Sequence, residues 1–139
     1  MTKSHKIIDR MKYWKKKLNL KRKFRYVEDN SVGASAYVEV YKKHVLFGFN
    51  CKVITLKKIS NHVDRVVLHE IGHIIRGGSE YKAEKYMLNM LYKYNKKLYN
   101  QITEYMKSFL YDNYLFAWEH PLHYKEFCKV YNVTNKYIL

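Results

Sequence analysis

The sequence has 139 residues, enough for one domain with its own core and too few for two ordinary domains. Hydrophobic residues make up 47% of the chain and Pro occurs once, so the composition excludes disordered and fibrous proteins. The formal net charge of +15 favours polyanionic partners such as nucleic acid, although a solvated, repulsive surface explains it equally well. We therefore expect a single globular domain over residues 1–139.

The cysteines and the hydropathy pattern predict where the protein resides. Cys51 and Cys128 lie far apart and match no metal-binding spacing, which is typical of reduced thiols in the cytosol. No apolar run reaches the length of a signal peptide or of a membrane-spanning segment. These features predict a cytoplasmic protein with no membrane span, and they leave its oligomeric state open.

The first half of the chain predicts one helix and a small sheet. Apolar residues at three- and four-residue steps predict an amphipathic helix over 4–18 with a very basic outer face. Aromatic and β-branched residues then predict strands over 24–27, 37–41, 44–49 and 52–56. We expect these segments to form a mainly antiparallel sheet of three to four strands.

Two helices are predicted to follow the sheet as a tight hairpin. Ser60 or Asn61 is a natural N-cap for a helix running to about Ile75, and the Gly77-Gly78 pair ends it. Ser79 then caps the second helix. The fold class that we expect is therefore α+β.

Further helices are predicted towards the C-terminus. One is expected to carry the apolar residues from Ile102 to Ala117, and Pro121 is well placed to open a last helix through about Tyr131.

The sequence His69-Glu70-Ile71-Gly72-His73 lies within the first helix of the expected hairpin. Two imidazoles four residues apart differ by about 40° around a helix, so both can point at a single ion. Glu70 lies beside them and can reach a water molecule in an open coordination position, as a general base requires. The flanking residues are apolar, and two buried histidines would be costly there unless satisfied. The motif therefore predicts zinc ligands at His69 and His73, with Glu70 as catalytic base.

A catalytic zinc ion normally takes a third protein ligand and leaves one position for water. Glu80 and Glu84 lie one turn apart at the start of the next helix, on the face that the hairpin turns towards His69 and His73. Carboxylates on an otherwise apolar stripe need a partner. The spacing predicts that one of the two is the third ligand and leaves the choice between them open.

The motif and the segment from Glu80 to Tyr86 resemble zincin metallopeptidases of the ImmA/IrrE type, many of which come from phages and mobile elements. The resemblance covers roughly residues 33–95. It implies a small zincin-like domain with Glu80 as the third zinc ligand and Glu84 as a partner that orients a histidine. It also implies a protein substrate, for which a DNA-binding regulator is one expectation.

The predicted chemistry is zinc-dependent hydrolysis of a peptide bond in a protein or peptide substrate. An extended substrate is expected to pair with an edge strand within 44–56, and His62 is one candidate for stabilising the oxyanion. Two alternatives stay open: a basic nucleic-acid-binding protein in which zinc is structural, and a protein that binds a host partner on a zincin scaffold. A closed, four-ligand zinc site would favour the first alternative.

Overall fold

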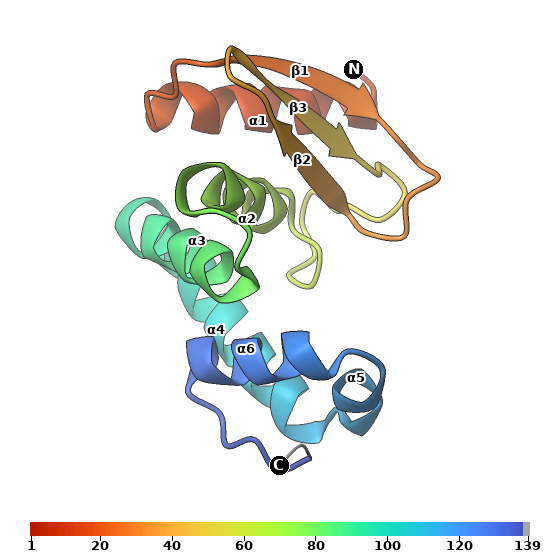
Figure 1. Cartoon of the computed structure of the whole chain (residues 1–139), viewed down its shortest axis with the longest axis vertical. Coiled ribbons are helices and arrows are strands. Elements are labelled where there is room, and N and C mark those ends of the chain that lie inside the picture. The colour runs from red at the N-terminus through yellow and green to blue at the C-terminus, as the bar shows by residue number, and fades with distance from the viewer. Residues whose placement is uncertain (138–139) are drawn as a thin grey trace.

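The computed structural model describes residues 1–137 and divides them into three layers (Figure 1). A three-stranded sheet and the N-terminal helix form one end, a pair of helices forms the middle, and three C-terminal helices form the other end. The elements are α1 (Lys3–Lys17), β1 (Lys23–Glu28), β2 (Ala36–Val40), β3 (His44–Phe49), α2 (Val63–Arg76), α3 (Glu80–Tyr94), α4 (Lys96–Asp112), α5 (Tyr114–Glu119) and α6 (Pro121–Tyr131).

Helix α1 packs its apolar stripe against the rest of the molecule. Ile7, Met11 and Trp14 are buried, as the three- and four-residue spacing predicts. The indole Nε1–H of Trp14 donates to Asp64 Oδ1 at 3.0 Å, and Arg10 forms a salt bridge with the same carboxylate. Because Asp64 lies in the first turn of α2, these contacts attach α1 to the helix that carries the motif.

The sheet has the order β1-β3-β2 and is mixed. β3 is the central strand, parallel to β1 and antiparallel to β2. The α+β class and the number of strands are confirmed. The expectation of a mainly antiparallel sheet holds only for the β2–β3 pair, since β1 pairs with β3 in the parallel direction rather than forming a hairpin with β2.

The prediction of a strand over 52–56 is wrong. The carbonyl of Asn50 accepts bonds from the backbone N–H groups of Val53 and Ile54, so the chain turns there instead of extending. Thr55 forms only an isolated bridge with His62. Both edges of β3 are already paired with β1 and β2, which leaves no place beside it for a fourth strand.

Helices α2 and α3 form the predicted hairpin, although the first of them begins later than expected. The N-cap of α2 is His62, whose Nδ1 accepts from Asp64 N at 3.1 Å, in place of Ser60 or Asn61. Gly77 ends α2 with a φ of 95°, a conformation that favours glycine, and Ser79 caps α3 as predicted.

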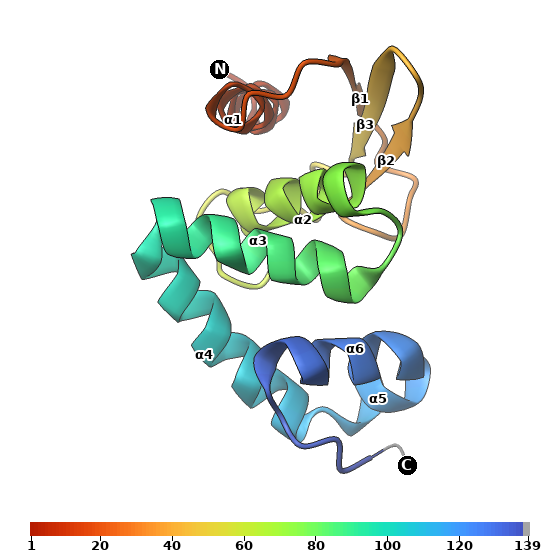
Figure 2. The same ribbon diagram turned by 60° about the vertical axis from the view of Figure 1, so that its left-hand side comes forward.

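The two helices of the hairpin approach closely at Gly72. A Cβ atom added there would lie 2.8 Å from both the Cα and the carbonyl oxygen of Ala83. Only a glycine in α2 permits this separation, and the two helices lie side by side (Figure 2).

The C-terminal helices close the far end of the molecule. The helix expected through Ala117 is interrupted at Asn113, whose side chain caps the short helix α5 by accepting from Phe116 N. Pro121 opens α6 as predicted, and α6 packs against α3 and α4. No helix within residues 1–137 is both long and apolar enough to cross a membrane.

Candidate metal centre and cleft

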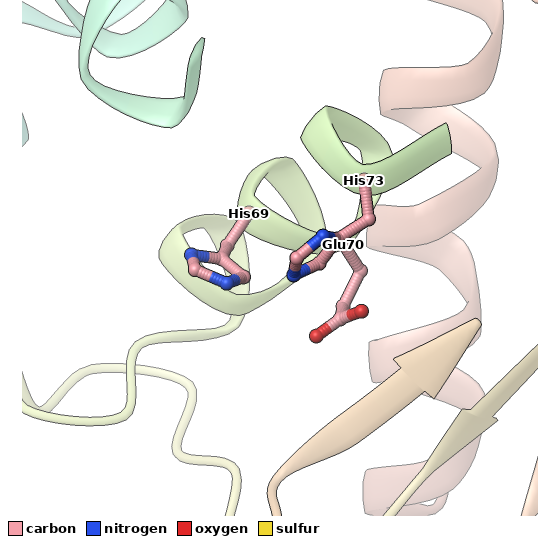
Figure 3. Close-up of side chains that lie close together, drawn as sticks. All are labelled: His69, Glu70 and His73. Carbon is pink, nitrogen blue, oxygen red and sulfur yellow. The ribbon is translucent and has the colours of Figure 1, made fainter. Parts of the chain in front are cut away.

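Helix α2 presents His69, Glu70 and His73 on one side (Figure 3). Possible ligand atoms of these three residues lie within 4.8 Å of one another, so the cluster could hold a metal ion. The rings of His69 and His73 have their centroids 4.9 Å apart, as expected for residues one helical turn apart. The sequence motif therefore folds into a compact group of donors on a helix that the core holds firmly.

Each histidine is oriented by an acceptor at its Nδ1 atom. His69 Nδ1–H donates to Glu84 Oε1 at 2.8 Å, and His73 Nδ1–H donates to the carbonyl oxygen of Gly77 at 3.0 Å. With Nδ1 protonated, each ring would present its Nε2 lone pair to a metal ion. Both Nε2 atoms face the same point.

The carboxylate of Glu80 lies at that point. Its Oε2 atom is 2.9 Å from His69 Nε2, and its Oε1 atom is 3.1 Å from His73 Nε2. Glu80 is the first residue of α3, so the turn at Gly77 and Ser79 delivers it to the two rings. Two imidazole nitrogens and one carboxylate are a donor set that zinc commonly takes, and this set could hold a zinc ion.

Glu84 is bound on the opposite side of His69. Its carboxylate is fully buried and accepts from His69, from Arg65 Nη2 at 2.8 Å and from the hydroxyl of Tyr131 at 2.6 Å. Arg65 and Tyr131 come from α2 and α6. Through this network, α6 helps to fix the orientation of the His69 imidazole.

Electrostatics in the cluster follow from burial and from these bonds. Burial disfavours the charged form of His69, but its hydrogen bonds with Glu80 and Glu84 outweigh burial and raise its pKa to about 10. Burial alone would raise the pKa values of Glu80 and Glu84. Cationic partners outweigh burial, chiefly His69 and His73 for Glu80 and chiefly Arg65 for Glu84, so both pKa values are held below the usual range.

Glu70 has the opposite environment. Burial raises its pKa to about 7, although the neighbouring histidines work against this rise. Within residues 1–137, no hydrogen bond or salt bridge engages its carboxylate, in contrast to Glu80 and Glu84. A carboxylate poised near neutral pH and not engaged by a neighbour is suited to exchange protons with a water molecule.

The cluster opens into a cleft. A cavity of about 270 Å³ extends from Glu70 towards α6, and a wider hollow of about 630 Å³ extends along β2 towards Gly77. The two share Ala36, Glu70 and Glu80 as lining residues, so together they run past the candidate metal site on both sides. The expectation of an accessible edge within 44–56 is wrong because β3 is central, and the edge strand that lines the cleft is β2.

Two histidines differ from the sequence-based interpretation. His62 caps α2 and lines a separate hollow with Lys6 and Arg10, so it is not part of the cleft. His123 of α6 lines the cleft instead, with its Nε2 atom 4.0 Å from Glu80 Oε1. Sequence reasoning missed His123 because a single histidine some 50 residues after the motif carries no spacing signal.

The comparisons with known proteins give no relative: no family model matches the chain, and neither a curated protein nor a solved structure is significantly similar to it.

Proposed function

We propose that the cleft between α2, α3 and β2 hydrolyses peptide bonds with the help of a zinc ion. The observation that carries this proposal is the convergence of His69 Nε2, His73 Nε2 and the Glu80 carboxylate, with the uncommitted Glu70 beside them. His69, His73 and Glu80 would hold the ion, and Glu84 would orient His69. Bound zinc supplies a Lewis acid that acidifies water and polarises a carbonyl group.

Glu70 performs the proton transfers in this proposal. Its carboxylate accepts a proton from the attacking water and delivers it to the nitrogen of the leaving amine. Burial disfavours the charged form of Glu70, which favours acceptance of the proton in the first step.

The substrate in this proposal is an extended peptide. In the described chain, β2 is paired on one side only, with β3, and its residues line the cleft beside Glu70 and His73. An extended segment can add to such an edge through main-chain hydrogen bonds, which places its carbonyl groups along the cleft. This mode of binding favours an unfolded or flexible segment of a protein over a folded surface.

Metal analysis tests the proposed ligands. Purified protein is expected to contain one zinc ion per chain, and Glu80→Ala is expected to weaken zinc binding by more than about 100-fold, because loss of an outer partner alone costs about 10- to 100-fold. Elemental analysis and competition with a chromogenic chelator measure both quantities. Glu104→Ala, at an exposed position of α4, is the matched control and should bind zinc normally. A Glu80→Ala protein with unchanged affinity would contradict the assignment.

His123 is the side chain that we expect to stabilise the oxyanion. His123→Ala should lower kcat by about 10²- to 10³-fold, as loss of one such donor does, while KM and zinc content stay unchanged. Steady-state kinetics with a quenched-fluorescent peptide measure the effect. His120→Ala is the control, since His120 is exposed and does not line the cleft. Loss of zinc from His123→Ala would instead indicate a fourth ligand and a structural metal site.

A further inference from the structure

The positive charge of the protein is concentrated at its N-terminus. Of the 27 Lys and Arg residues, eleven lie within residues 1–25, where Asp9 is the only acidic residue. The remaining 114 residues carry sixteen basic and eleven acidic side chains, so their charges come much closer to balance. Solubility requires only a net charge spread over the surface, so it does not explain why the basic residues are concentrated in this segment.

Five of these eleven basic residues line one groove. Asn19 adopts a left-handed conformation with a φ of 56°, which turns the chain after α1 so that β1 returns beside the helix (Figure 2). A hollow of about 560 Å³ lies between the two elements. Its lining includes five lysines, which we call the lysine groove: Lys12, Lys15, Lys16, Lys21 and Lys23.

In the part of the chain that the structure describes, the lysine groove has no anionic partner. Among residues 1–137, none of the salt bridges involves any of its five lysines. Lys15 Nζ lies 5.5 Å from the ring centroid of Phe24, and all five lysines line the same hollow. Like charges held this close repel one another, and an external polyanion would relieve that repulsion.

We propose that the lysine groove binds the phosphate backbone of duplex nucleic acid. A membrane surface fits less well, because an interfacial helix needs a free apolar face and α1 buries Ile7, Met11 and Trp14 in the core. An acidic protein also fits less well, because the centres of protein interfaces are poor in lysine and rich in exposed aromatic anchors. The groove offers lysines without such an anchor.

The lining of the groove indicates how the nucleic acid is read. Its two aromatic residues, Phe24 and Tyr26, are buried and half-buried, so the groove offers little aromatic surface on which an unpaired base could stack. Lysine contacts to phosphates position a protein without selecting a sequence. We therefore expect binding that favours a duplex, is insensitive to base sequence and is strongly dependent on salt.

The groove and the cleft are separate sites. They share no lining residue, and the groove lies on α1 and β1, whereas the candidate metal site lies on α2 and α3. Nucleic-acid binding should therefore survive removal of metal and the Glu70→Gln substitution. A substitution that abolishes the function of one site should leave the other site functional, so the two proposals can be tested independently.

The test is binding of a fluorescein-labelled 20-base-pair DNA duplex, followed by anisotropy between 50 and 200 mM KCl. The full-length protein should bind with a Kd that rises steeply with salt. The triple variant Lys12→Gln, Lys16→Gln, Lys23→Gln should lose at least about tenfold in affinity, and its log–log salt slope should flatten by about two to three, close to one per phosphate contact removed.

The matched control removes the same charge elsewhere. Lys42→Gln, Lys43→Gln, Lys57→Gln alters three exposed lysines outside the groove, and it should change the affinity less than about threefold. Equal losses in the two triple variants would overturn the proposal, because the charge would then act diffusely. So would absence of duplex binding at 50 mM KCl, or tighter binding to phosphatidylserine vesicles than to the duplex. Circular dichroism would verify that each variant is folded.

Discussion

Replacing Glu70 by Gln is expected to abolish peptide hydrolysis while leaving zinc in place. The amide keeps the size of the side chain and cannot accept a proton from water, so the rate should fall by the contribution of a general base, about 10²- to 10⁴-fold. Because His69, His73 and Glu80 converge without Glu70, the zinc content should remain one ion per chain. Initial rates on a mixture of quenched-fluorescent peptides, together with elemental analysis, measure both quantities.

Two comparisons make this experiment decisive. Glu104→Gln removes the same charge from an exposed position of α4 and should leave the rate unchanged. If Glu70→Gln lost its zinc, Glu70 would be a ligand and not a base, which its place within 4.8 Å of both histidines would allow. If the variant kept its zinc and hydrolysed peptides at the original rate, Glu70 would have no catalytic role. If the variant is instead inactive and keeps its zinc, it can be used to capture the natural substrate.

Local signals in the sequence predicted the elements that carry the candidate centre. Four local features were predictable because each depends on interactions within a few residues. They are the spacing of His69 and His73, the end of α2 at Gly77, the N-cap of α3 at Ser79 and the start of α6 at Pro121. The residues that make such interactions are neighbours in the sequence, so a single sequence is enough to predict them. The α+β class followed from the same local patterns.

Long-range packing decided what the sequence left open. Whether Glu80 or Glu84 faces the Nε2 atoms depends on the rotation of α3 against α2, which the contact of Gly72 with Ala83 helps to set. His123 reaches the cleft only because α6 packs on α3. The expectation of a mainly antiparallel sheet failed at β1 for the same reason, since a parallel β1–β3 pair brings together segments that no turn connects.

Replacing Glu84 by Ala is expected to have the largest effect on stability. Glu84 is 1% exposed, and its carboxylate neutralises Arg65, whose side chain is 15% exposed. Removing one partner of a buried ion pair leaves the other charge uncompensated, which lowers the free energy of unfolding by about 3–5 kcal/mol. Tyr131 and His69 would also lose an acceptor. Urea unfolding followed by circular dichroism, in EDTA, measures the loss without a contribution from metal.

A second substitution separates the buried charge from simple loss of packing. In the Glu84→Ala background, Arg65→Met removes the uncompensated guanidinium, so it should restore part of the stability, whereas in the original protein the same change should be destabilising. The two effects therefore have opposite signs if Glu84 acts through Arg65. Equal costs of Arg65→Met in both backgrounds would mean that the pair is not coupled, and that Glu84 orients His69 without help from the Arg65 charge.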